Sequence, residues 1–183
     1  MNMITSKPVY ALSIAGPFGR WLVGNEKISG LGRKSIELRS WKVRHRDILV
    51  LIHVSQSTDY DHHFTRMPFT RKDCPKSCII GAAVLKDIIL YQTEDLWRQD
   101  QQKHCWVGDE SFDYIYTDCY RGTPYGHTFV DQLLFEEPIL NVPGDRGYWQ
   151  PNPKKPIQQA KQEPAFNEAI RRIQAVRPTM LAA

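Results

Sequence analysis

The residues whose types and spacing could do chemistry are concentrated in one segment, RKSIELRSWKVRHR, at positions 33–46. Within it, Lys34 and Arg39 flank a carboxylate, Glu37, in the pattern K-x-x-E-x-R. Two neighbouring cations favour the ionised form of a carboxylate, which could then orient a hydroxyl or amino group or act as a base. Lys34 could stabilise negative charge or activate a nucleophile. An ordinary surface ion pair, which contributes little stability, is the alternative interpretation of the same pattern.

A strand is predicted to carry these residues. Ile36 and Leu38 alternate with Glu37 and Arg39, which is the period of two expected of a strand with one buried face. The polar side chains should then project together, away from the core. The next segment, DILVLIHVS at 47–55, is continuously apolar and rich in Val and Ile, which predicts a central strand.

Similar patterns predict the remaining elements of the domain. The apolar run at 78–91 predicts a long strand that bends at Gly81 or Asp87. Residues 56–78, which include Tyr60, show no clean periodicity and predict a short helix and a mobile loop. The other expected elements are strands at 9–16 and 145–151, a strand or strand pair at 125–140, and helices at about 17–24 and at 93–106.

The C-terminal part of the chain differs in character. Four prolines fall within the fourteen residues PNPKKPIQQAKQEP, which carry no apolar periodicity, so residues 152–164 are predicted to form a linker. Residues 165–183 predict an amphipathic helix and a tail, with an apolar stripe that includes Phe166 and Ile173. The expected organisation is a domain at 1–151, this proline-rich linker, and a helix that could bind a partner protein or a second copy of the chain.

The charge of the chain is unevenly distributed. The formal net charge is only +4, but residues 20–46 hold eight Lys or Arg against two Glu. Residues 94–118 hold seven Asp or Glu against two Lys or Arg. A chain with this asymmetry can present a basic face to a polyanion, and nucleic acid is the expected polyanion.

Composition excludes several classes of protein. No apolar run approaches the roughly 20 residues that span a bilayer, and MNMITSKPVY lacks the apolar middle of a signal peptide, so a cytoplasmic protein is expected. Four cysteines in 183 residues predict reduced thiols rather than disulfides. The CPKSC segment at 74–78 does not combine with the histidines into a common zinc module. We therefore expect neither a metal nor a cofactor.

The order of the motifs resembles the ASCH family (activating-signal-cointegrator homology domains), a branch of the PUA-like β-barrels. The resemblance spans roughly residues 8–151 and rests on ALSIAGPFGRWLV, KSIELRSW, DILVLIHVS, CIIGAAVLKDII and DRGYWQP. It implies an α+β fold, a small and mostly antiparallel PUA-like barrel with short flanking helices. Family members are associated with RNA and DNA binding. Some bacterial members are acetylcytidine amidohydrolases, and others have been described as ribonucleases.

The resemblance also implies where a ligand would lie. The strand with Lys34, Glu37 and Arg39 would form the floor of a cleft, with the cations near phosphate or a nucleobase and the carboxylate near an amino or hydroxyl group. His53 and Ser55 match a family "HAS" motif and could bond to a base or sugar edge. The leading hypothesis is binding of RNA or a nucleotide-like ligand. The further nucleic-acid contacts predicted are base stacking by Trp41 and phosphate contacts by Arg44, Arg46 and Arg20.

A small hydrolase acting on a modified nucleoside or on the RNA backbone is the alternative, with Lys34 and Glu37 as the catalytic residues. In the amidohydrolase members the position matching Glu37 is a threonine, so this chain departs from their pattern. Their third catalytic group, a glutamate, would fall near Glu94 or Asp95. The 24–33 segment resembles an insertion that would change how Lys34 is positioned.

Overall fold

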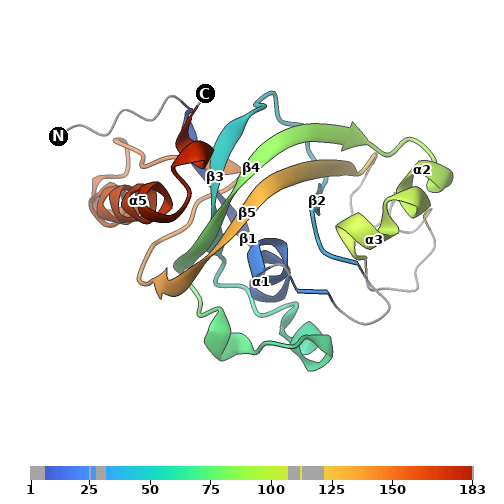
Figure 1. The fold of residues 1–183 in the computed structure, drawn as a ribbon, viewed down its shortest axis with the longest axis horizontal. Coiled ribbons are helices and arrows are strands. Elements are labelled where there is room, and N and C mark those ends of the chain that lie inside the picture. Colours follow the sequence, from blue (N-terminus) through green and yellow to red (C-terminus); the bar gives the residue numbers. More distant parts are fainter. Residues whose placement is uncertain (1–6, 25, 28–31, 107–111, 113–121, 183) are drawn as a thin grey trace.

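The structure is a computed structural model that describes residues 7–24, 26–27, 32–106, 112 and 122–182. Within these residues the chain forms a six-stranded, curled sheet with helices packed around it (Figure 1). The strands are β1 (Val9–Ile14), β2 (Ile36–Arg39), β3 (Ile48–Val54), β4 (Cys78–Leu90), β5 (Tyr125–Ile139) and β6 (Tyr148–Trp149). The α-helices are α1 (Gly16–Gly24), α2 (Glu94–Gln99), α3 (Gln101–His104) and α5 (Pro156–Val176), and the 3-10 helices are η1 (Asp61–Arg66), η2 (Arg71–Asp73) and η4 (Pro178–Leu181).

The strands lie in the order β2-β5-β4-β3-β1-β6. β1 pairs with β3 in parallel, and the other neighbouring pairs are antiparallel. The parallel pair is possible because α1 and β2 lie between β1 and β3 in the sequence and return the chain to the same end of the sheet. The predicted α+β fold with a mostly antiparallel sheet is therefore confirmed.

β4 and β5 are the long strands whose bending curls the sheet (Figure 1). Their pairing shifts register at three places, of which the first adjoins Gly81 and the third adjoins Asp87. Such irregularities bend a strand and increase its twist. A Cβ atom at Gly81 would lie 2.3 Å from the carbonyl oxygen of Leu133, so glycine permits the close approach of β5. The sequence predicted a bend at Gly81 or Asp87, and the register shifts next to both residues agree with it.

The central strands divide their side chains between two hydrophobic clusters. Leu49 and Leu51 of β3 pack in the cluster that α5 joins, whereas Val50 and Ile52 pack in the cluster that α1 joins. All seven residues of β3 are buried. The continuous apolar run at 47–55 therefore does form a central strand, covered on both faces, as predicted.

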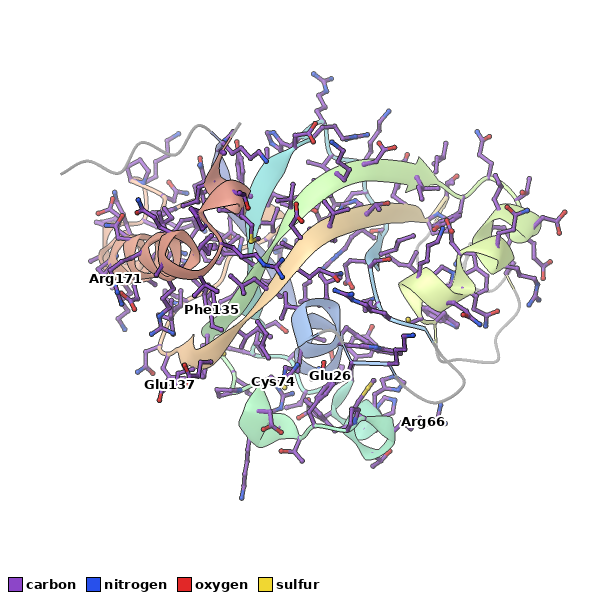
Figure 2. The ribbon with its side chains drawn as sticks, in the orientation of Figure 1. Glu26, Arg66, Cys74, Phe135, Glu137 and Arg171 are labelled. Atoms are coloured by element: carbon purple, nitrogen blue, oxygen red, sulfur yellow. The ribbon has the colours of Figure 1, made fainter. Side chains whose placement is uncertain are left out.

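α5 forms part of this core. Phe166 and Ile173 are buried in the cluster with Leu49, and the helix lies beside the sheet in Figure 1. Figure 2 shows Phe135 of β5 between the sheet and α5, with Arg171 on the outer side of the helix. The apolar stripe that was predicted to bind a partner is thus largely buried against the domain itself. No helix within the described residues is both long enough and apolar enough to cross a membrane.

The predicted linker at 152–164 is wrong from Pro156 onward, because α5 begins at that residue. Pro156 lies in the first turn, where its missing N–H removes no helical hydrogen bond. Pro164 lies inside the helix, at a cost that the buried side chains of Phe166 and Ile173 offset. The helix therefore starts at a proline that its first turn accepts, and its buried side chains begin at Gln162.

If α5 is part of the domain core, shortening a buried side chain on it will destabilise the whole domain. Ile173 is fully buried, so Ile173→Ala is expected to lower the free energy of unfolding by about 2–5 kcal/mol. Val176, which is 67% exposed, provides the matched control, and Val176→Ala is expected to cost under about 0.5 kcal/mol. Urea unfolding measures both. Equal midpoints for the two variants would contradict the packing described for α5.

Candidate functional site

Lys34, Glu37 and Arg39 form a buried ion triad. Glu37 lies between the two cations, with Oε2 at 3.3 Å from Lys34 Nζ and Oε1 at 3.2 Å from Arg39 Nη2. The exposed fractions of the three side chains are 5%, 10% and 21% in chain order. The expectation that these side chains project away from the core is therefore wrong. The spacing in the sequence correctly predicted that the three residues interact, but it did not predict that they are buried.

β2 is buried on both faces, which explains the triad's position. Ile36 and Leu38 pack with Tyr91 and Trp97 in a separate hydrophobic cluster. The alternate residues face the other side, where the curled sheet brings β1 and α1 close to β2. Strand periodicity predicted which residues share a face, but a second covering layer cannot be read from alternation.

Lys34 fastens β2 to α3. Its Nζ donates to the carbonyl oxygen of Ile36 at 2.8 Å and to that of His104 at 2.9 Å, in addition to its ion pair with Glu37. The ammonium group thus makes two hydrogen bonds and one ion pair within the domain. The carbonyl of Lys34 accepts from Gln132 Nε2 at 2.8 Å, which adds a bond to β5.

Arg39 joins two strands that are not neighbours in the sheet. Its Nη2 donates to the carbonyl oxygen of Ser13 on β1, at 3.0 Å. β2 and β1 are separated by three strands in the sheet order, so this bond closes the curled sheet across its open side. Arg39 Nε is buried without a partner among the described residues. One donor of this guanidinium group is therefore left over at the site.

His127 and Tyr148 make a second closure next to the triad. His127 lies opposite Glu37 in the pairing of β5 with β2. Its Nε2 is 3.1 Å from the carbonyl oxygen of Trp41, and its Nδ1 is 3.0 Å from the hydroxyl of Tyr148. A carbonyl can only accept, so Nε2 carries the proton and Nδ1 accepts from the hydroxyl.

The pKa of His127 is lowered to about 4. Burial is the largest cause and the charge of Arg39 adds to it, while the hydrogen bond to Trp41 has a smaller, raising effect. The imidazole is therefore neutral near pH 7. Burial also raises the pKa of Tyr148, so its hydroxyl stays protonated. Sequence reasoning missed both residues, because the only signals were a histidine within an apolar strand and a short aromatic pair far along the chain.

The indole ring of Trp41 packs against this second closure. Its ring lies edge-on to His127, with centroids 5.0 Å apart, and to Tyr148, with centroids 5.7 Å apart. The residue is half-buried. Trp41, proposed from the sequence as a stacking residue, therefore already makes aromatic contacts within the domain.

His53 has structural partners on both ring nitrogens. Nε2 bonds the carbonyl of Val142 at 2.9 Å and Nδ1 bonds Ser13 Oγ at 3.0 Å, and the residue is 1% exposed. Burial lowers its pKa, so the ring is neutral. Ser55 is half-buried and donates its backbone N–H to the carbonyl of Ile14. Both residues lie on or next to β3 and fasten neighbouring segments.

The arginines predicted to contact phosphate differ in their availability. Arg20 pairs with Glu26 at 2.7 Å, and Arg46 pairs with Asp87 at 2.9 Å. Arg44 is exposed and makes no ion pair within the described part of the chain. The same holds for Lys42, which the sequence analysis did not single out.

Three other predictions concern residues outside the triad. Glu94, one of the two candidates for a third catalytic group, pairs with Arg98 on the exposed surface of α2, where Asp95 is also exposed. Residues 25 and 28–31 of the 24–33 segment lie outside the described residues. Among the described residues no three His, Cys, Asp or Glu side chains are grouped as metal ligands would be.

A hollow of about 700 Å³ lies away from the triad. It is bordered by the first turns of α5 and by loops that include Gln56, Ser77 and Asn141. None of the triad residues lines it. The expected cleft over the K-x-x-E-x-R strand therefore does not coincide with this hollow.

Comparison with known proteins supports the fold. No protein-family model and no curated protein matches the chain. The solved structure of ASCH from Zymomonas mobilis is 12% identical, with a TM-score of 0.54 over 83% of this chain and 93% of that chain. Two mutant forms of the same protein are 14% and 13% identical, each with a TM-score of 0.52, over 86% and 83% of this chain and 97% and 96% of theirs. The resemblance to ASCH domains is thus confirmed at the level of the fold.

Removing the carboxylate of the triad will leave the buried ammonium of Lys34 and the partly buried guanidinium of Arg39 without a counter-charge. Glu37→Gln is therefore expected to lower the free energy of unfolding by about 3–5 kcal/mol. Glu94→Gln breaks the exposed pair with Arg98 and is expected to cost under about 1 kcal/mol. Denaturant unfolding at pH 7 compares the two. A loss for Glu37→Gln no larger than for the control would show that the triad is not buried as described.

The neutral, buried His127 predicts a stability that falls in acid. Its folded pKa of about 4 lies below the ordinary value of 6.5, so between these pH values the unfolded chain takes up a proton that the folded chain does not. This difference is worth about 3 kcal/mol, fully present as stability above pH 6.5 and lost as the pH falls towards 4. His127→Gln should flatten the dependence of stability on pH in this window, whereas His62→Gln, which removes an exposed histidine, should not. The free energy of unfolding is measured in urea at pH 7.5, 5.5 and 4.5. If it falls with pH equally in wild type and His127→Gln, His127 is excluded as a source of the effect.

Proposed function

We propose that this domain binds single-stranded RNA along β2, with cations of the segment 39–46 contacting phosphates. The observation that carries the proposal is the row of available donors on this segment. Lys42 and Arg44 are exposed side chains without ion pairs among the described residues, and they follow Arg39, whose side chain is 21% exposed. Unpaired Lys and Arg on one short segment are the groups that neutralise a phosphate backbone.

The triad supports this arrangement electrostatically. It holds two cations and one carboxylate, a formal net charge of +1, and the exposed cations Lys42 and Arg44 follow it in the chain. Buried charges are screened less by salt than exposed ones. ASCH domains, whose fold the chain has, are associated with RNA and DNA binding, which agrees with a polyanionic ligand at this strand.

The contacts of Lys34 favour binding over hydrolysis at this site. It donates hydrogen bonds to the carbonyls of Ile36 and His104 and forms an ion pair with Glu37. To activate a nucleophile, or to stabilise negative charge on a reacting oxygen, the ammonium group would have to break hydrogen bonds that hold α3 against β2. Glu37 is likewise held by two cations, which suits an acceptor for a ligand's amino or hydroxyl group better than a base.

Replacing the two exposed cations should weaken RNA binding and its salt dependence together. The double variant Lys42→Ala/Arg44→Ala is expected to bind a fluorescein-labelled oligo-uridine more weakly. The slope of log affinity against log salt should become shallower by about 0.7 for each phosphate that the variant no longer neutralises. Fluorescence anisotropy at several salt concentrations measures both quantities.

Lys161→Ala is the matched control, because Lys161 is an exposed cation that borders the hollow beside α5. It is expected to leave the slope unchanged. A double variant with wild-type affinity and slope, or a larger effect from Lys161→Ala, would place the RNA elsewhere on the domain.

A further inference from the structure

We infer that the domain has an aromatic subsite at the start of η1, where the exposed ring of Tyr60, the residue before that helix, stacks on an unpaired base of the same RNA. This inference rests on the proposed RNA-binding function and adds a second, non-ionic contact to it. The subsite lies in the segment 56–78, which the sequence analysis left without a role.

Aromatic contacts lead without a break from the triad to Tyr60. The ring centroid of Phe18 on α1 is 5.8 Å from Lys34 Nζ. The same ring is 5.5 Å from the ring of Tyr60 and 5.3 Å from that of His63. Tyr60 is therefore one aromatic ring away from the buried lysine. A ligand over the triad is in reach of it.

The ring of Tyr60 contacts the rings of Phe18 and His63, and about half of the residue is exposed to solvent. It lies nearly parallel to the ring of His63, with centroids 6.2 Å apart and an angle of 13°. Tyr60 is nevertheless 48% exposed. His62, which is exposed, lies 4.0 Å from His63 by ring centroids, so the aromatic surface extends beyond Tyr60 itself. Bases stack readily on such rings, and they do so with little dependence on sequence.

η1 is anchored to the rest of the domain, so this surface is preformed. The guanidinium of Arg71 pairs with Asp61, lies 5.0 Å from the ring centroid of Phe64 and donates to the carbonyl of Cys74 at 3.4 Å. It also fills the space beside α1, where a Cβ at Gly16 would lie 2.5 Å from Arg71 Nη1. A ring on an anchored turn loses little freedom on binding, which favours affinity.

The positions of the two contacts define the size of the ligand. The two contacts are the base stack on Tyr60 and the phosphate contact of Arg44. Lys34, which lies near the aromatic rings, precedes β2 in the chain, and Arg44 follows β2. Four residues of strand span about 13 Å. An RNA that reaches both contacts must therefore extend along the strand, which a free nucleoside does not do. The inference thus favours an oligonucleotide over a modified nucleoside as the ligand.

The test uses the full chain and a short single-stranded RNA that contains one 2-aminopurine, whose fluorescence is quenched when it stacks. Wild type, Tyr60→Phe and Tyr60→Leu are compared by anisotropy and by this quenching, with the 2-aminopurine placed at each position in turn. Ile157→Leu, at a residue that is 83% exposed on α5, is the control for changes in exposed apolar surface. Thermal unfolding of each variant checks that the fold is retained.

We expect wild type, Tyr60→Phe and Ile157→Leu to bind alike and to quench the base at one position. Tyr60→Leu should lose that quenching and at least about fivefold in affinity, with an unchanged salt slope because no charge is removed. If Tyr60→Leu binds and quenches as wild type does, the subsite is refuted while the proposed RNA binding stands. If wild type itself does not bind the RNA, the proposed function fails, and the subsite fails with it.

Discussion

The need to balance the charge of a buried carboxylate is the constraint on which the structure around β2 depends. Glu37 is tolerated at 8% exposure because Lys34 and Arg39 lie on either side of it. The remaining donors of those two cations then determine which segments come together. Lys34 holds the end of α3 and Arg39 holds β1, so the edge strand of the sheet is fixed on both sides. Side chains, rather than another backbone ladder, close the curled sheet here.

The triad is mostly buried, whereas the aromatic ring and the cations proposed to contact the RNA are exposed. Apolar residues of similar volume often replace a buried ion triad without loss of stability, so a contribution to stability is a weak explanation for its presence. Its position offers a better one. At one end of β2, Lys34 lies near the ring of Phe18, which contacts Tyr60, and beyond the other end Lys42 and Arg44 follow Arg39 in the chain as exposed cations. The proposed RNA, an extended and flexible polyanion, would lie between the aromatic rings near one end of β2 and the cations that follow the other.

The sequence predicted the parts of this structure that depend on short-range pattern. Alternation identified the strands, and the spacing K-x-x-E-x-R identified the triad. Its burial, and the bond from Arg39 to Ser13, depend on a strand pair that no local pattern encodes. His127 and Tyr148 likewise meet Trp41 across 86 and 107 positions of chain. The start of α5 was predicted too late because prolines were counted as linker residues, although Pro156 occupies a position where helices accept proline.

The central claim is that RNA lies along β2, between the aromatic surface on η1 and the cations that follow the strand. Backbone amide chemical shifts recorded during a titration with unlabelled oligo-uridine test it most directly. The account predicts that the largest shifts fall in residues 33–46 and 57–66 and that α5 is unaffected. Shifts concentrated instead at the first turns of α5 and around the hollow beside Gln56, Ser77 and Asn141 would contradict it.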